Sequence, residues 1–77
     1  MDYQFLYIFT IGRRPEWSGE TADSLRERLV SDPLRLGERD KAEDFIARAR
    51  PGDHTVLTGE LKDGTIHQVI IIRARDH

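Results

Sequence analysis

Residues 54–75, HTVLTGELKDGTIHQVIIIRAR, decide the fold because they hold two strand-like runs joined by a strong turn signal. Asp63-Gly64 suits a type I′ turn, in which both central residues need positive φ. With these two residues as the loop, Leu61 faces Ile66, and every further pair follows by counting outward along the strands. The turn therefore predicts which side chains share each face of the hairpin.

One face of this hairpin is expected to lie on the core, and the other is expected to stay partly apolar without cover. Leu57 and Ile70 lie opposite each other on the expected core face. A one-residue bulge would exchange part of this assignment, because a slip by one residue turns every side chain of a strand to the other face. The second face carries Val56, Val69 and Ile71 at its centre, Glu60 opposite His67 at one end, and His54 opposite Arg73 at the other.

Residues 3–11 predict a first strand, since this run is rich in aromatic and β-branched residues and holds no Gly or Pro. The two hairpin strands are neighbours, so we expect the first strand at an edge of the sheet, where it invites pairing with another chain. The alternative is that a loop or the C-terminal tail covers this edge. The expected core face holds Tyr3, Phe5, Tyr7, Phe9 and Ile11, and the other face holds Gln4, Leu6, Ile8 and Thr10.

Two helices are predicted between the first strand and the hairpin. Residues 12–19, GRRPEWSG, form a loop in this interpretation, because Gly and Pro punctuate them and Ser18 suits a helix N-cap. The first helix spans roughly residues 20–30 and the second roughly residues 38–50, where apolar residues recur at helical spacing. Pro51-Gly52 ends the second helix.

The elements together predict a single small α+β domain over residues 1–77, with two layers and the order β-α-α-β-β. Two amphipathic helices pack on one face of the expected three-stranded sheet, and no further element remains to cover the other face. An apolar centre with a charged rim is typical of a protein interface. The alternative is that Val and Ile stand there for their β-propensity alone, as exposed apolar residues often do.

The composition limits the classes of function that fit the chain. Its net charge is −2 and its pI is near 5.9, which argues against general phosphate binding. It contains no cysteine, and a reducing cytoplasm fits that absence. Its apolar runs are too short to span a membrane, and the N-terminus lacks the basic region of a signal peptide.

The residues give no sign of a catalytic, cofactor-binding or metal-binding site. His54 lies about 20 Å from Glu60 along the strand, so it cannot share a metal ion with His67, which faces Glu60, and His77 is terminal. We interpret Glu60 and His67 as an electrostatic cross-strand pair. No nucleophile elbow and no phosphate-cradling glycine motif occurs. We therefore expect a protein that is not an enzyme and holds no metal or cofactor.

Arg13, Arg14, Arg73 and Arg75 are the arginines outside the helical region. If the two strand ends that carry them are adjacent, their guanidinium groups cluster and can hold a phosphate or an acidic partner. The alternative is that all four are ordinary solvated arginines.

Trp17, the only tryptophan, stands beside a proline and two arginines in the predicted loop, and Trp and Arg are common at binding hot spots. With Ser18 as the N-cap, however, Trp17 and Ala22 have the spacing of a hydrophobic staple, which would bury the indole on its own helix. A binding anchor and a staple are both open interpretations of this residue.

These features favour a small non-enzymatic module that binds a protein partner through the exposed sheet face or the edge strand. In composition, the chain is similar to phage-encoded inhibitors of host proteins, which are often small, highly charged and free of cysteine. Such a protein would inhibit a larger host protein. The expected partner-binding residues are Val56, Val69, Ile71, Arg73, Trp17, Arg13 and Arg14.

Two alternatives accompany this hypothesis. The β-α-α-β-β order resembles the front part of RelE/ParE-like toxins, in which a helical hairpin follows the first strand. This resemblance implies a small nucleic-acid-directed module that uses the arginines, although the chain lacks the basic surplus of that family. The other alternative is a structural homodimer whose subunits pair through the sheet.

Overall fold

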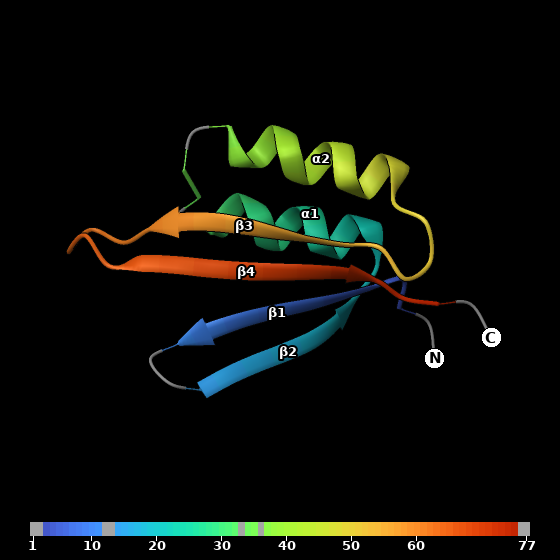
Figure 1. The fold of residues 1–77 in the computed structure, drawn as a ribbon, viewed down its shortest axis with the longest axis horizontal. Helices are drawn as coiled ribbons and strands as arrows, with labels where there is room; N and C mark the ends of the chain where they lie inside the picture. The colour runs from blue at the N-terminus through green and yellow to red at the C-terminus, as the bar shows by residue number, and fades with distance from the viewer. Residues whose placement is uncertain (1–2, 12–13, 33, 36, 76–77) are drawn as a thin grey trace.

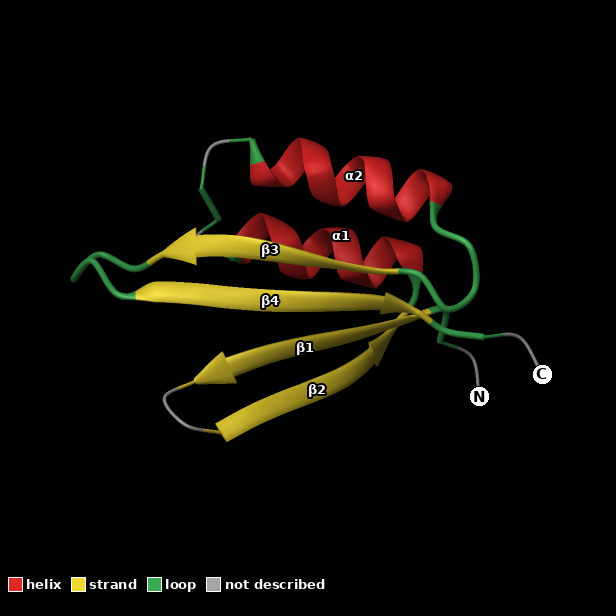
Figure 2. Ribbon diagram, viewed as in Figure 1, coloured by secondary structure: helices red, strands yellow, loops and turns green. Residues whose placement is uncertain are grey.

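The computed structural model describes residues 3–11, 14–32, 34–35 and 37–75 and has two layers, a sheet and a pair of helices (Figure 1). The sheet is antiparallel with the strand order β2-β1-β4-β3, and both helices lie on the same side of it (Figure 2). The α+β class, the two helices on one face and the C-terminal hairpin are confirmed, whereas the prediction of three strands is wrong by one. The elements are β1 (Phe5–Ile11), β2 (Arg14–Glu20), α1 (Ala22–Ser31), α2 (Glu38–Arg48), β3 (His54–Glu60) and β4 (Ile66–Arg73).

The additional strand, β2, comes from the segment that the sequence predicted as a loop. Because β2 is an edge strand, it tolerates Pro15, whose missing N–H costs no ladder hydrogen bond on the outer side. Glycine is required at position 19 for a different reason, because a Cβ atom there would lie 2.7 Å from Cγ of Tyr3. Proline and glycine thus fill two special positions of a strand, and the loop prediction is wrong over residues 14–19.

β1 is an inner strand, which corrects its predicted place at a sheet edge. It pairs with β2 on one side and with β4 on the other. The prediction placed β1 at the edge because it counted one strand too few. The element order on which the resemblance to RelE/ParE-like toxins rested is wrong for the same reason, since β2 stands between β1 and the helices.

The turn between β3 and β4 has three loop residues, 62–64, instead of the predicted two. Leu61 donates its N–H to the Thr65 carbonyl at 2.9 Å, and Gly64 adopts a left-handed φ of +87°. A three-residue loop that ends on a left-handed glycine is one of the common hairpin connections. The pairing of the two strands is therefore shifted by one residue from the predicted register.

This shift exchanges the two faces of β4. Leu57 pairs with Val69, so Val69 and its neighbour on the same face, Ile71, lie under the helices. Both residues are 0% exposed. The prediction that they lie on the uncovered face is wrong, because it assumed a two-residue turn. Ile70 and Ile72 occupy the uncovered face in their place.

The hydrophobic core fills the space between the sheet and the helices. Each helix contributes one buried stripe, and the predicted core face of β1 is confirmed at Phe5 and Tyr7. Burial of these side chains supplies the main favourable term for folding. The buried apolar residues are Phe5, Tyr7, Leu25, Leu29, Ala42, Ile46, Leu57, Val69 and Ile71.

Candidate functional site

The sheet face opposite the helices, called the open face below, carries one row of large apolar side chains across all four strands. Trp17 of β2 pairs with Ile8 of β1. Ile8 also pairs with Ile70 of β4, which pairs in turn with Val56 of β3. Directly opposed residues have Cβ atoms about 5 Å apart, so the four side chains form a continuous line. Trp17 is 66% exposed and Val56 is 37% exposed, so both ends of the line are on the surface.

A second apolar row lies beside the first. Leu6 pairs with Ile72 of β4 on one side and with Gly19 of β2 on the other. The Tyr3 ring lies over Gly19, at the place where a side chain would otherwise stand on the open face. Tyr3 therefore does not follow the predicted alternation onto the core face, since the chain bends at Gln4 before β1 begins.

A groove of about 430 Å³ lies on the open face over β1 and β2. Its lining is mostly apolar and combines residues of both rows with the first half of β2. Such a groove accepts apolar side chains of another molecule rather than a charged ligand. It is lined by Tyr3, Leu6, Ile8, Pro15, Glu16 and Trp17.

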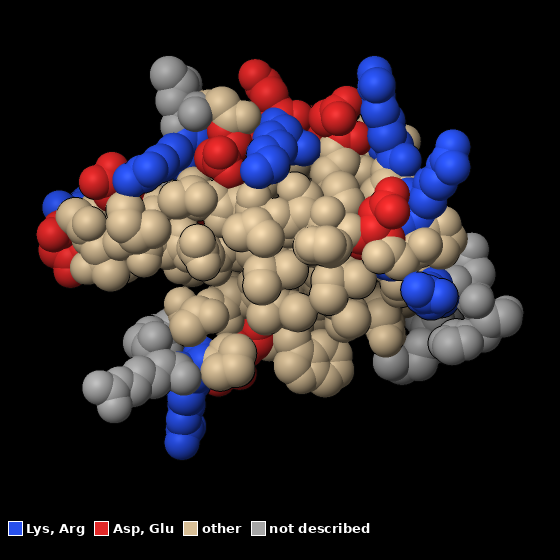
Figure 3. Space-filling view, viewed as in Figure 1, with Lys and Arg blue, Asp and Glu red and all other residues tan. Residues whose placement is uncertain are grey.

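The described chain leaves the open face without cover, because α1 and α2 both pack on the opposite side of the sheet. The space-filling view shows charged side chains around the periphery and a broad uncharged area over the sheet (Figure 3). An apolar centre with a charged periphery is the arrangement expected of a surface for protein contacts.

Trp17 is a strand residue on this face and not a staple of the first helix. α1 begins after Thr21, whose Oγ1 accepts the Ser24 N–H at 3.2 Å while the Ser24 hydroxyl accepts the Thr21 N–H at 2.9 Å. This reciprocal capping box makes Thr21 the N-cap. The Ser18 cap and the staple that depended on it are wrong, and the indole stays exposed.

Arg73 was predicted on the open face, and the one-residue shift turns it to the helix side. Its guanidinium lies 5.6 Å from the centroid of the Phe5 ring. Its Nη1 donates to the carbonyl oxygens of Gln4 at 3.2 Å and of Ala74 at 3.0 Å. Arg73 therefore ties the end of β4 to the start of β1, which is a structural role.

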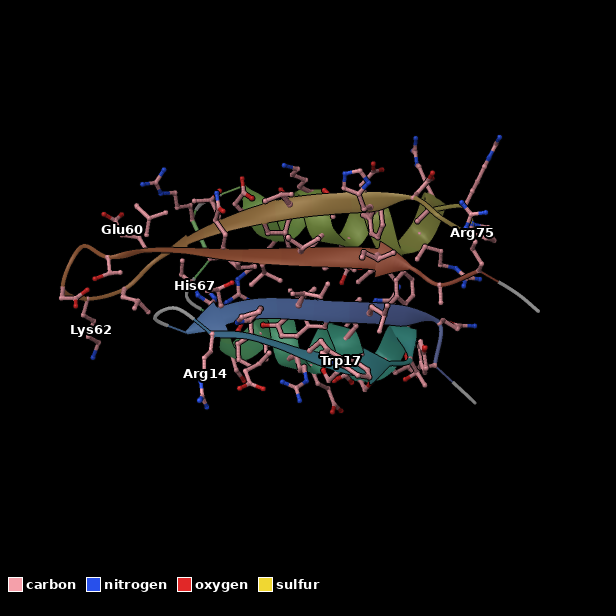
Figure 4. All side chains as sticks on the ribbon, turned by 60° about the horizontal axis from the view of Figure 1, so that its bottom comes forward. Arg14, Trp17, Glu60, Lys62, His67 and Arg75 are labelled. Atoms are coloured by element: carbon pink, nitrogen blue, oxygen red, sulfur yellow. The ribbon has the colours of Figure 1, made fainter. Side chains whose placement is uncertain are left out.

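The predicted arginine cluster does not form among the described residues. Arg73 pairs with the first residue of β1 and Arg14 pairs with its last. The length of β1, about 20 Å, therefore separates them. Figure 4 shows Arg14 and Arg75 at opposite ends of the molecule. Arg13 lies outside the described residues.

The two edges of the sheet differ in how their backbone groups are occupied. At β3, the Arg35 N–H donates to the Thr58 carbonyl at 3.0 Å, and the Glu38 carboxylate accepts the Thr58 N–H at 2.9 Å. Lys41 Nζ donates to the Val56 carbonyl at 2.8 Å. Over the part of the chain that the structure describes, no such hydrogen bond reaches the outer side of β2. β2 is therefore the open edge of this sheet.

A cleft of about 690 Å³ opens where β1 and β4 diverge beyond their last paired residues. His67 lies in its lining, between the β4 and β1 ribbons (Figure 4). His67 pairs with Gly59, whereas Glu60 pairs with Ile66. The predicted cross-strand pair of Glu60 and His67 is therefore wrong, because neighbouring residues of a strand point to opposite faces.

Two charged side chains near this cleft, Asp32 and Arg28, both contact Tyr7. The Tyr7 hydroxyl donates to the Asp32 carboxylate, and the Arg28 guanidinium lies 5.4 Å from the centroid of the Tyr7 ring. Burial, together with the hydrogen bond and the negative charge of Asp32, raises the pKa of Tyr7 well above its ordinary value. Tyr7 therefore stays protonated at neutral pH and serves as a donor rather than as a base.

The buried carboxylate of Glu20 joins β2 to α1. It accepts hydrogen bonds from the hydroxyls of Ser18 at 2.8 Å and Ser24 at 2.5 Å, and it pairs with the Arg28 guanidinium. Burial alone would disfavour the charge, but the hydrogen bonds and the Arg28 charge outweigh it and lower the pKa of Glu20. The hydroxyls of Ser18 and Ser24 therefore have a structural role, because both donate to the Glu20 carboxylate.

Sequence reasoning missed Ile70, Ile72 and Tyr3 as members of the open face. Residues 69–72 read Val-Ile-Ile-Ile, which is apolar on both faces, so alternation carries no signal of a one-residue shift. The Tyr3 placement depends on the bend at Gln4, and no motif marks that bend. Val56 lies on the open face as predicted.

Comparison of the chain with protein families, with curated proteins and with solved structures finds no match. Among the described residues, no three His, Asp or Glu side chains come together in a group that could hold a metal ion. No helix in the described ranges is both long and apolar enough to cross a membrane.

Proposed function

We propose that this chain is a non-enzymatic protein-interaction domain whose open face binds a partner protein. The observation that carries the proposal is the row of Trp17, Ile8, Ile70 and Val56, which reaches across the whole sheet without cover from the described chain. Single apolar residues on a surface are ordinary, but two adjacent rows exceed what β-propensity alone requires.

The distribution of exposure within the row supports a binding anchor at Trp17. Large aromatic side chains contribute most of the free energy at many interfaces, and they do so from the centre of a desolvated patch. Trp17 combines high exposure with a neighbouring apolar groove, so a partner can bury the indole without moving the sheet. If the surface of the partner that binds the open face is one that the partner needs for its own activity, binding inhibits the partner, which is the role expected from composition.

The polar side chains between the sheet and α1 are bonded to one another, which also favours binding over catalysis. Burial and the hydrogen bond to Asp32 raise the pKa of Tyr7 and keep it neutral, and the hydroxyl of Ser24 is bonded to Glu20. Arg28 is paired with the same glutamate. These groups stabilise the contact between the sheet and α1, and they are on the side of the sheet away from the open face.

The test is capture of a partner from cell extract by three immobilised proteins: the unchanged chain, Val56→Lys and Val30→Lys. Val56 is in the apolar row, whereas Val30 is 68% exposed on α1, outside the open face. Both substitutions are expected to cost within about 0.5 kcal/mol of stability, because a lysine stem can lie on the surface with its ammonium in water. Circular dichroism checks the fold of each variant.

We expect a protein that binds the unchanged chain and Val30→Lys but is lost with Val56→Lys. Its binding should survive nuclease treatment and raised salt, because an apolar contact does not depend on counterion release. Equal capture by all three proteins contradicts the proposal. Loss of capture on nuclease treatment favours the nucleic-acid alternative.

A further inference from the structure

We infer that β2 is a self-association edge, at which a second copy of this chain adds its own β2 in antiparallel orientation about a two-fold axis. The inference goes beyond the proposed function, because it concerns the edge of the sheet and a second copy rather than the open face and a foreign partner. Edge strands with free backbone groups are the usual sites of such pairing.

The hydrogen-bond ladder determines which residues of β2 turn their backbone groups outward. Arg73 of β4 turns both backbone groups to the β3 side, where its N–H donates to the Asp53 carbonyl and its carbonyl accepts the Gly52 N–H, each at 2.8 Å. Even-numbered residues of β4 therefore bond to β1, in the register that pairs them with even-numbered residues of β1. Bonding alternates along an antiparallel strand, so even-numbered residues of β1 bond to β4 and odd-numbered residues bond to β2. In the β1–β2 register, this leaves Pro15, Trp17 and Gly19 with outward-directed backbone groups.

The other edge of the sheet, β3, supports this assignment, and part of its outer side is already hydrogen-bonded. The same alternation directs the backbone groups of even-numbered β3 residues outward. Both backbone groups of Thr58 do point outward, to Arg35 and Glu38, and the Val56 carbonyl accepts from Lys41. A second copy therefore finds its backbone partners at β2 and not at β3.

Charge selects the register of the pairing. Centring the two strands on Trp17 overlaps β2 along its whole length and places Arg14 opposite Glu20 of the second copy, and Glu16 opposite Ser18 of the second copy. A shift of two residues in either direction sets Glu16 against a glutamate, Glu20 or Glu16 of the second copy. Like charges directly opposite each other are destabilising and opposite charges are favourable, so the centred register is preferred.

The centred register also joins the apolar surfaces. Each Trp17 meets the Trp17 of the second copy on the axis, and the Tyr3 ring over Gly19 lies beside Pro15 of the second copy. Each Trp17 N–H can reach the other Trp17 carbonyl, and each Gly19 N–H can reach the other Pro15 carbonyl. Pro15 has no N–H, so the pairing uses its carbonyl alone.

Two measurements on the purified chain test the inference. Sedimentation equilibrium from about 1 µM to about 1 mM should show conversion from monomer to dimer within that range. The fluorescence of Trp17, the only tryptophan, should shift to shorter wavelength over the same concentrations, because the indole leaves water. A monomer throughout this range overturns the inference.

Charged substitutions at the axis identify the pairing surface. Trp17→Lys and Trp17→Glu should each weaken self-association about thirtyfold or more, since each puts two like charges on the axis in place of an aromatic anchor. An equimolar mixture of the two variants should associate again, because the lysine of one copy then faces the glutamate of the other. Leu61→Lys, which adds a charge at the β3–β4 turn at a site that is 43% exposed, is the control and should leave association unchanged.

If the single variants dimerise like the unchanged chain, or if the mixture does not associate, the pairing at β2 is refuted. The outcome is separate from that of the proposed function. A chain that dimerises through β2 but captures no protein through the open face refutes the proposed function alone, and the reverse result refutes the dimer alone.

Discussion

Ile70 and Ile71 are neighbours on β4 whose truncation tests the register of the sheet. Ile71 is 0% exposed in the core, while Ile70 is half-buried on the open face. Ile71→Ala removes buried atoms and leaves a cavity, which should cost about 3–4 kcal/mol. Ile70→Ala removes atoms that already touch water in part, so its cost should be about 1 kcal/mol.

These costs are large against the stability of so small a domain. At about 0.05–0.15 kcal/mol per residue, a chain of 77 residues is stable by about 4–12 kcal/mol. For a domain of this size each kcal/mol lowers the melting temperature by about 4–8 °C. We therefore expect Ile71→Ala to lower the melting temperature by about 12–30 °C and Ile70→Ala to lower it by about 4–8 °C.

Thermal melts followed by circular dichroism, with urea titration in parallel, measure both variants against the unchanged chain. Val30→Ala on the exposed side of α1 is the matched control and should stay within about 0.5 kcal/mol of it. The two-residue turn would exchange the faces of β4 and reverse the order of the two costs. A loss for Ile70→Ala equal to or greater than the loss for Ile71→Ala would therefore refute the three-residue turn.

Three further predictions address the turn and the two perturbed groups. Gly64→Ala should cost about 1–2 kcal/mol in urea unfolding, because its φ of +87° is strained for any residue with a Cβ; an unchanged midpoint speaks against the left-handed loop. In a Tyr3→Phe background, tyrosinate absorbance should show that Tyr7 ionises well above its ordinary pKa of 10.0. The stabilisation by the Tyr7 hydroxyl is then present below pH 10 and is lost as the pH rises further. Titration at the ordinary pKa contradicts the hydrogen bond between Tyr7 and Asp32. Because the pKa of Glu20 is lowered in the folded chain, this residue stabilises the fold above its ordinary pKa of 4.5, and the stabilisation is lost as the pH falls below that value. Glu20→Gln should therefore make the free energy of unfolding depend less on pH in the acid range. An unchanged dependence on pH rules out this linkage.

The helices and the core face of β1 could be predicted because their signals are local and redundant. Leu25 and Leu29 repeat at helical spacing, and Ala42 and Ile46 do the same in α2; all four are buried. In β1, aromatic residues occupy one alternating face, and the burial of Phe5 confirms it. Periodicity identifies an element when one face is clearly more apolar than the other.

β2 could not be predicted, because its strand character depends on its position in the fold. Pro15 argues against a strand in general and is tolerated here only at a sheet edge. Gly19 argues for a turn until Tyr3 is seen to fill the space that it leaves. Neither fact is visible before the sheet order is known, and composition alone therefore favoured a loop.

The face of β4 could not be predicted for a different reason. Asp63-Gly64 fits a two-residue turn and also fits the end of a three-residue loop that includes Lys62, so the dipeptide does not determine the register. The alternation of apolar and polar residues along a strand normally resolves such an ambiguity, but residues 69–72 are apolar on both faces. The β4 residues predicted on the uncovered face, Val69, Ile71 and Arg73, were therefore all placed on the wrong face, while Val56 on β3 was placed on the correct one.

The unequal edges of the sheet limit what the chain can assemble. An apolar sheet with two open edges can add strands without end and form fibres. Over the described residues, Arg35, Glu38 and Lys41 bond to outward backbone groups of β3 at Thr58 and Val56, which leaves β2 as the more open edge for another strand. Pairing β2 with β2 about a two-fold axis uses this edge in both copies, and the contact is closed, so pairing at β2 stops at two copies. The open faces of the two copies then lie side by side as one larger apolar surface, in which the two Trp17 side chains meet on the axis and the rest of the row, Ile8, Ile70 and Val56, stays available to a partner in each copy.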